Sequence, residues 1–170
     1  MDPIMQQMGA LQTDELSVLR EFSQALAGAL DCDELLALVP PALHRLVPCD
    51  ISALAVSTDT VPRVLLRDAR PVGEPIREQA RLLVCSAFHR LTGIPPADAR
   101  IDHGRASGEA SQQDASGDIQ SICDVPLSTT EGVVGAVSVL SLQKEGFDEH
   151  AVSLVRTLAS QTAAAVARIR

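Results

Sequence analysis

The alternation of apolar and polar residues is clearest in the last third of the chain. Residues 122–141, ICDVPLSTTEGVVGAVSVLS, hold two apolar runs separated by a polar turn. Side chains alternate between the faces of a strand. In 133–140 both faces are mostly apolar, which predicts a central strand covered on both sides. Pro126 has no N–H for a ladder, so we expect it at a strand end, an edge or a bulge. Gly132 and Gly135 permit a tight turn or a close approach of backbones.

The segment 148–170 repeats its apolar residues at helical spacing and predicts a terminal helix. Asp148 is suited to the N-cap position. Phe147 and Val152 are spaced as the two partners of a hydrophobic staple. The helix runs to Arg170 without a capping residue, so we expect it to continue into a coiled-coil linker and an output domain of a larger protein.

Earlier segments also show helical or strand patterns. Helices are predicted at 13–30, 31–47 and 74–92, and strands at 51–57, 63–70 and 99–103. Pro40-Pro41 interrupts the second helix and predicts a kink or a restart, because proline removes a hydrogen bond and clashes with the preceding turn. Residues 104–118 show no periodicity and predict a mobile loop, a lid or a disordered segment.

This order of elements predicts an α+β fold with one mainly antiparallel sheet of five or six strands. We expect a single domain over residues 14–170, preceded by a flexible segment at 1–13. The N- and C-terminal helices should pack together on one face of the sheet. The third helix and the 104–118 loop should cover a pocket on the other face.

The composition of the chain argues against several classes of protein. Net charge of −8 argues against binding to nucleic acid, and 2% aromatic residues leave no base-stacking platform. No apolar run approaches the ~20 residues that span a bilayer. The N-terminus lacks the basic and apolar regions of a signal peptide. We therefore expect a cytoplasmic chain without membrane contact.

The sequence offers little catalytic or metal-binding chemistry. It has no G-x-S-x-G, no phosphate-binding loop and no H-E-x-x-H, so we assign no catalytic residue and no cofactor. Cys85 and His89 are one helical turn apart, but two ligands do not make a metal site. Cys123 is read as a core thiol, because a reactive thiol needs a nearby cation or helix N-terminus. The four cysteines, at 32, 49, 85 and 123, are expected to be reduced.

Three stretches together resemble the GAF domain family over about residues 14–170. They are LVPCDISALAV at 46–56, the VPL step leading into GVVGAVSVL, and the Phe-Asp pair that opens the terminal helix. The resemblance implies a small-molecule-sensing regulatory domain of a larger signal-transduction protein, such as a histidine kinase, a cyclic-di-GMP enzyme or a transcription regulator. It also implies a ligand between the sheet and the helix-and-loop face, and dimerisation through the terminal helices.

Specialised members of that family have markers that this chain lacks. The NKFDE-like motif of cyclic-nucleotide binders is absent, and GFDE at 146–149 is read as the start of a helix. Bilin-binding members have a Cys followed directly by His, whereas Ser86 follows Cys85 here. The pattern around the cysteines of free-methionine-sulfoxide reductases is also missing. The ligand is therefore expected to be a small apolar or weakly anionic molecule rather than a nucleotide.

The residues predicted to line the pocket come from the strands and from the helix that covers the sheet. They are Leu54 or Val56, Leu83 and Phe88, Cys123 or Val125, and Ser138 or Leu140, with Arg67 and His103 as polar contacts. A slip of one residue in a strand reverses its faces, so the alternatives stay open. Arg67, Arg70, Arg100 and His103 are candidates to converge on an anion. The competing interpretation, which we prefer, is a solvated edge strand.

The terminal helix carries a second set of apolar positions, Leu154, Leu158 and Ala165, beside its core stripe. A helix that is apolar on more than one side needs more than one partner. We therefore expect a homodimer through residues 14–30 and 148–170, which Leu154→Glu should convert into a folded monomer. Two alternatives to the sensor are a ligand-free dimerisation or scaffold module and a redox enzyme that uses Cys85 or Cys123.

Overall fold

The computed structural model of the chain describes residues 3–106 and 117–170, apart from the side chain of Leu11. Most of the loop expected at 104–118 lies outside these residues, so its mobility stays a prediction. The elements are α1 (Pro3–Gly28), α2 (Cys32–Leu46), β1 (Ile51–Val56), β2 (Arg63–Asp68), α3 (Glu74–Thr92), β3 (Arg100–Gly104), β4 (Ser121–Thr129), β5 (Gly132–Ser141) and α4 (Glu149–Ile169).

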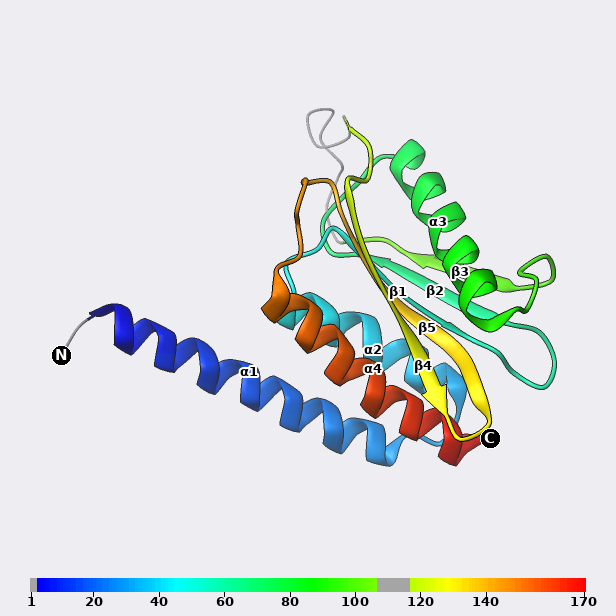
Figure 1. Ribbon diagram of the computed structural model, residues 1–170, viewed down its shortest axis with the longest axis horizontal. Coiled ribbons are helices and arrows are strands. Elements are labelled where there is room, and N and C mark those ends of the chain that lie inside the picture. Colours follow the sequence, from blue (N-terminus) through cyan, green and yellow to red (C-terminus); the bar gives the residue numbers. More distant parts are fainter. Residues whose placement is uncertain (1–2, 107–116) are drawn as a thin grey trace.

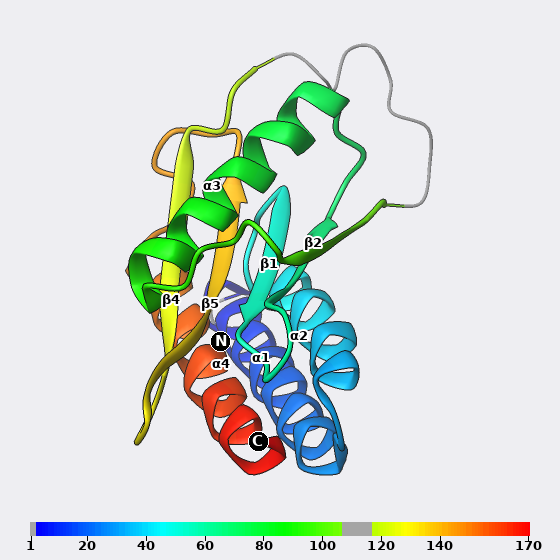
Figure 2. The same ribbon diagram turned by 90° about the vertical axis from the view of Figure 1, so that its right-hand side faces the viewer.

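The five strands form one sheet in the order β3-β2-β1-β5-β4. Every neighbouring pair is antiparallel except β2 and β3, which are parallel. Figures 1 and 2 show α1, α2 and α4 on one face of the sheet and α3 on the other. The predicted α+β fold, with a mainly antiparallel sheet and its terminal helices on a common face, is confirmed.

Strand β5 lies between β1 and β4 in the sheet and is buried on both faces. Val137 and Val139 face the layer of α1, α2 and α4, whereas Leu140 faces α3. A Cβ atom at Gly135 would lie 2.2 Å from the Ala55 carbonyl oxygen, so only glycine fits this crossing of backbones. Pro126 lies in the edge strand β4, next to a bulge, as its missing N–H predicts.

Helix α2 passes through its two prolines without restarting. The Asp31 side chain caps it by accepting from the Glu34 N–H at 2.9 Å. The expected restart at Pro40-Pro41 is absent. Leu36, Val39 and Leu43 are buried on both sides of the prolines, and this packing keeps the helix continuous despite the lost backbone hydrogen bond.

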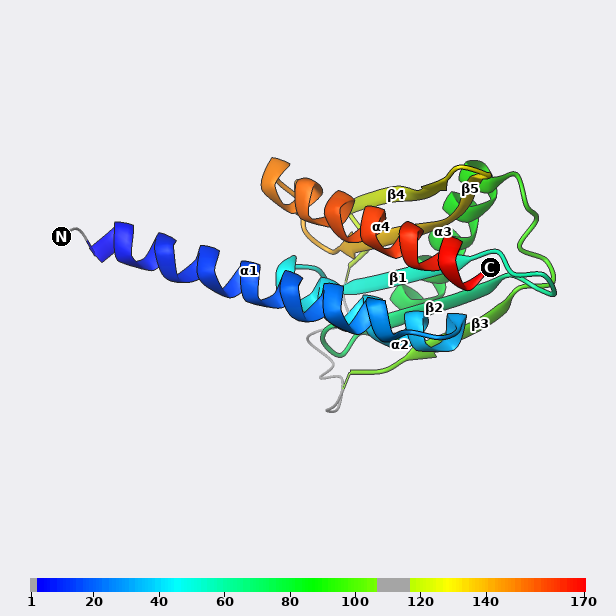
Figure 3. The same ribbon diagram turned by 90° about the horizontal axis from the view of Figure 1, so that it is seen from below.

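Helix α1 begins ten residues earlier than the sequence pattern predicted. It starts at Pro3 rather than after Thr13, whose hydroxyl donates back to the Gly9 carbonyl at 2.8 Å as in a helix interior. Proline favours the first turn, and the Gln, Met, Ala and Leu residues that follow are good helix formers. The segment 3–13, expected to be irregular, is therefore helical. It projects beyond the other elements in Figures 1 and 3.

Helix α4 is apolar on more than one side because two parts of its own chain cover it. It packs on the sheet and also on α1 and α2. Leu158 is fully buried, and Leu154 and Ala165 are 7% and 6% exposed. The apolar positions assigned to contact with a second subunit therefore pack against other elements of the same chain. Leu154→Glu would bury a charge in this packing rather than release a folded monomer. The homodimer itself stays a prediction.

Within the described ranges, no helix is both long and apolar enough to cross a membrane.

Candidate functional site

Half of the predicted pocket residues meet in the layer between α3 and the sheet. Leu83 and Phe88 reach it from α3, and Ser138 and Leu140 from β5. Phe88 and Leu140 are fully buried. The Ser138 hydroxyl donates to the Asp124 carboxylate at 2.6 Å. Apolar side chains fill the rest of the layer, among them Ile51, Leu66, Ile76, Ala80 and Val84.

The other half lies on the opposite face of the sheet. Leu54 and Val56 are buried against the layer of α1, α2 and α4, and Cys123 and Val125 pack against the same cluster. Because strand side chains alternate, these four residues cannot share a cavity with Phe88. The structure therefore does not bring the predicted lining residues together around one space.

Two open cavities among the described residues lie away from α3. A crevice of about 520 Å³ runs beside β4 and the start of α4, where Cys123, Phe147 and Val152 contribute to its wall. A groove of about 370 Å³ lies between α1 and α4 and is lined by small residues such as Ser23 and Ala164. Both are open surface features, and neither reaches Phe88.

The four candidate cations do not converge on one point. Arg70 pairs with Asp50, and the Arg100 Nε lies 3.5 Å from an Asp102 oxygen. Arg67 is exposed and is the register partner of Ser52 in β1. The Ser52 hydroxyl lies 2.7 Å from Nε2 of His44 in α2. His103 lies on the α3 side. The four cations therefore form no common anion site, and three of them have a carboxylate partner of their own among the described residues.

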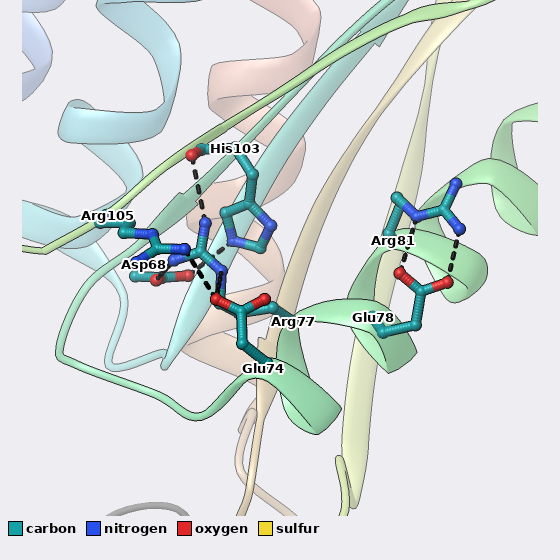
Figure 4. Close-up of polar contacts among 7 residues, drawn as sticks. All are labelled: Asp68, Glu74, Arg77, Glu78, Arg81, His103 and Arg105. Carbon is teal, nitrogen blue, oxygen red and sulfur yellow. Dashed lines mark hydrogen bonds and ion pairs between the residues drawn. The ribbon is translucent and has the colours of Figure 1, made fainter. Parts of the chain in front are cut away.

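His103 belongs instead to a cluster around a buried carboxylate (Figure 4). The Asp68 side chain is 1% exposed, and its two oxygens are held at 2.7 Å by Arg77 and by His103 Nε2. Arg77 also donates to the His103 carbonyl oxygen at 3.2 Å. These contacts tie β2, β3 and the second turn of α3 together. Sequence reasoning missed the cluster, because nothing in the spacing of Asp68 and Arg77 distinguishes them from surface charges.

Among the described residues, the space beside the cluster is too small for a ligand. Arg105 donates to Glu74 at 2.7 Å across the outer edge, and Glu74 lies 3.8 Å from the Arg77 Nε. The adjoining cavity measures about 90 Å³, well below the roughly 300 Å³ of small ligand sites. Asp68 and Glu74 also balance the charge of Arg77 and Arg105. The arrangement is a structural clamp rather than a binding site.

The surroundings of the four cysteines disfavour the thiolate form. Burial raises the pKa of all four, and that of Cys49 reaches about 12. A thiolate, which redox chemistry requires, is therefore disfavoured at neutral pH. Cys85 lies on the α3 side of the sheet and Cys123 on the opposite side, so they cannot pair. Among the described residues no three His, Cys, Asp or Glu are grouped to hold a metal, and His89 beside Cys85 is exposed.

Helices α1 and α4 run parallel and are joined along their length. Near the start of α4, His150 Nε2 lies 2.8 Å from Glu15. Ser23 donates to Gln161 at 2.9 Å midway. At the far end, Arg168 donates to three carbonyl oxygens at the C-terminal end of α1. They belong to Leu26 (2.7 Å), Ala27 (2.9 Å) and Ala29 (3.0 Å). We call this contact the α1–α4 seam.

Comparisons with known proteins agree on the family. A model of the GAF domain matches residues 14–166, whereas a search of curated proteins found no match. The GAF domain of a phosphoenolpyruvate-protein phosphotransferase from Coxiella burnetii has a TM-score of 0.56 at 17% identity, covering 92% of this chain and 94% of that one. The corresponding Acinetobacter domain has a TM-score of 0.54 at 16% identity, with 90% and 92% covered.

A fragment of a methyl-accepting chemotaxis protein, residues 122 to 287 of that protein, is also similar. Its TM-score is 0.51 at 15% identity, and the match covers 87% of this chain and 96% of that one. At these identities the structural matches show the fold alone, and the family match carries the assignment. The resemblance predicted from the sequence is confirmed: the chain belongs to the GAF domain family, a family of regulatory and sensory modules.

Proposed function

We propose that this domain senses a small molecule and relays the binding event through α1 and α4 to a linked output domain. The observation that carries the proposal is the α1–α4 seam. Helix α4 packs on β4 and β5, while α3 packs on β5 and β1 from the other side. A shift of α3 can therefore reach α4 through β5, and the contacts of Glu15 and Arg168 would pass it to α1.

The input site that fits this route best is the layer between α3 and the sheet. The layer is apolar, and one end of α3 is held to the sheet by the Asp68 clamp. A ligand that entered here would displace Phe88, and α3 with it, from sheet residues such as Leu66 and Leu140. The apolar surroundings favour a small apolar or weakly anionic molecule over a nucleotide, and we propose no catalytic activity.

The similar structures support a regulatory setting. Two are GAF domains of phosphoenolpyruvate-protein phosphotransferases and one is part of a methyl-accepting chemotaxis protein. We propose that this domain likewise belongs to a larger signal-transduction protein, such as a histidine kinase, a cyclic-di-GMP enzyme or a transcription regulator, in the cytoplasm. We also propose that it forms a homodimer through its terminal helices.

Native mass spectrometry of the gently purified protein tests the sensor. A retained small molecule, lost on denaturation, is the expected result. Calorimetry with cyclic AMP and cyclic GMP checks the ligand class, because micromolar binding of either, worth about 8 kcal/mol, would contradict our preference. An empty protein whose melting temperature no metabolite mixture raises would count against sensing altogether.

A second candidate is a ligand-free scaffold that only dimerises. The layer under α3 favours it, because Phe88, Ile76 and Leu140 are at most 1% exposed and belong to one apolar cluster. The two functions differ in one measurable respect. Small apolar molecules should raise the melting temperature of the wild-type sensor, whereas in a scaffold only a Phe88→Ala variant, whose new apolar cavity can hold such a molecule, should respond.

A further inference from the structure

Strand β4 forms one edge of the sheet, and part of its backbone has no partner within the described ranges. The Ser57 N–H donates to the Val134 carbonyl oxygen, which identifies the β5 residues that bond to β1. Bonded residues alternate along an antiparallel pair, so the odd-numbered residues of β5 bond to the odd-numbered residues of β4. The backbone groups of Ile122 and Asp124 therefore point away from the sheet. Pro126, which has no N–H to donate, occupies the next outward position.

The two edges of the sheet differ in how they are protected. Natural proteins blunt exposed strand edges with charged side chains, prolines or a covering element. The edge at β3 has Arg100 and Asp102, both exposed. The edge at β4 is mainly apolar before its proline, with Ile122 at 40% exposure. Its one charged residue, Asp124, already has Arg90 as a partner. The β4 edge is thus open to pairing with a further strand.

The crevice of about 520 Å³ described above lies along this edge. Residues 120–124 line one side of it, and the turn at 145–147 lines the other with the start of α4. Ile122 and Cys123 point to opposite faces of the sheet. Because both line the crevice, it follows the edge of the sheet rather than one face.

The wall opposite β4 is held in place and carries a carboxylate. The Ser121 hydroxyl donates to the Gln143 carbonyl oxygen at 2.5 Å and accepts from the Gly146 N–H at 2.9 Å. Glu145 lies between these two contacts and lines the crevice. Its φ of 51° is in the left-handed region, where glycine is favoured. Side chains held in such conformations cluster at functional sites, and a carboxylate on an open crevice is suited to a cationic partner.

The charge around the crevice separates the possible occupants. Residues 118–124 and 143–152 contain five carboxylates and one lysine. A second copy of this chain at the same edge would bring two such acidic surfaces together, and nucleic acid would be repelled by them. An extended segment with positive charge supplies both the missing backbone partners and the opposite charge.

We propose that the edge of β4 binds an extended, basic peptide of another protein by strand addition. The peptide pairs with the free backbone groups of Ile122 and Asp124. Its apolar side chains lie beside Ile122 and Cys123, and an arginine or lysine lies next to Glu145. Pro126 ends the paired stretch, which limits it to about five residues. This inference goes beyond the sensing proposed above and does not rest on it.

Fluorescence anisotropy with a labelled probe peptide tests the proposal. The probe alternates threonine and valine between two terminal arginines, a pattern that suits an added strand. It should bind the full chain with a dissociation constant on the order of 100 µM, because the contact is short. A probe with glutamates in place of the arginines should bind roughly tenfold more weakly or not at all. Equal binding of the two probes, or no binding of the arginine probe at about 1 mM, would overturn the proposal.

Substitutions in the protein separate backbone pairing from side-chain contact. Ile122→Pro removes one outward N–H and no bond of the ladder, as Pro126 does in the native strand, and should abolish binding. Ile122→Val is the matched control, because it keeps the N–H and should bind like the wild type. Loss of binding in both would contradict strand addition. Glu145→Gln should weaken the arginine probe about threefold or more and leave the melting temperature unchanged; an unchanged affinity would remove Glu145 from the site.

Amide hydrogen exchange of the wild-type chain gives a test that needs no variant. The Ile122 and Asp124 N–H groups should exchange fast in the free protein and about tenfold more slowly with saturating probe. Those of Val137 and Val139 in β5 should not change. Unchanged exchange at Ile122 and Asp124 with the probe bound would overturn strand addition.

The same measurement without probe tests the other occupant. Slower exchange of the two β4 amides on raising the protein concentration would show that a second copy occupies the edge, and the peptide proposal would fail. Either failure leaves the proposed sensing intact, because that proposal concerns the layer between α3 and the sheet.

Discussion

The Asp68 clamp allows a prediction about the free energy of unfolding. Arg77 and Arg81 both lie on α3 and both pair with a carboxylate, but only the Arg77 pair is buried. Arg77→Met removes a guanidinium that is 9% exposed from a carboxylate that is 1% exposed. His103 then remains as the one side-chain partner of Asp68. Loss of one partner from a buried ion pair costs about 3–5 kcal/mol, because the other charge stays buried and uncompensated. For a chain of this size that corresponds to a melting temperature lower by roughly 6–20 °C.

Arg81→Met is the matched control. Arg81 lies one turn further along α3 and holds Glu78 through two hydrogen bonds of 3.0 and 2.5 Å. Its side chain is 42% exposed, however, and that of Glu78 is 57% exposed. An exposed pair contributes little to stability, so we expect a urea midpoint close to that of the wild type.

Urea unfolding of both variants provides the comparison. If Arg77→Met loses no more stability than Arg81→Met, the argument from burial is refuted. A second variant adds Asp68→Asn to Arg77→Met, which removes the unpaired charge and should restore part of the loss. If the double variant is less stable than Arg77→Met alone, the cost does not come from the buried carboxylate.

The other predictions concern α4 and its contacts. Leu154→Ala should lower the free energy of unfolding by about 2–5 kcal/mol, the usual cost of truncating a buried leucine, and a change below about 1 kcal/mol in urea unfolding would contradict its burial. Glu15 raises the pKa of His150, so this contact stabilises the fold below the unfolded-state pKa of about 6.5 and is lost as the pH rises through the folded-state value. Glu15→Gln should therefore destabilise the protein more at pH 5.5 than at pH 8.5, and an equal effect at both would disprove the ion pair. Arg168→Met should speed amide hydrogen exchange in the last turn of α1 more than in α3, whereas Arg168→Lys should have a smaller effect; uniform exchange across the protein would argue against a local cap.

Local patterns predicted most of the fold. The helix at 74–92 has the predicted bounds because Pro75 and Gly93 mark its two ends. The buried strand at 133–140 and the cap at Asp148 follow from alternation and from side-chain chemistry. The start of α1 was misplaced because Thr13 resembles a capping residue, whereas the structure uses its hydroxyl within the helix.

The candidate site was predicted less well because it depends on which residues meet across the fold. Leu54 and Phe88 are both apolar and both buried, and only the register of β1 shows that they lie on opposite faces. Leu154 was assigned to an interface because an apolar helix face has the same sequence pattern whether its partner belongs to the same chain or to another. Arg168 and the carbonyl of Ala27 are 141 positions apart, and no local pattern connects them.

The parallel course of α1 and α4 also determines how the domain would bear a mechanical load. The two helices point the same way, so the N-terminus of one and the C-terminus of the other lie at opposite ends of the molecule (Figure 1). A pull between these ends slides the helices past each other. The contacts at Glu15, Ser23 and Arg168 would then resist together instead of opening one after another. Such a shear geometry makes the domain a stiff element in a chain under tension.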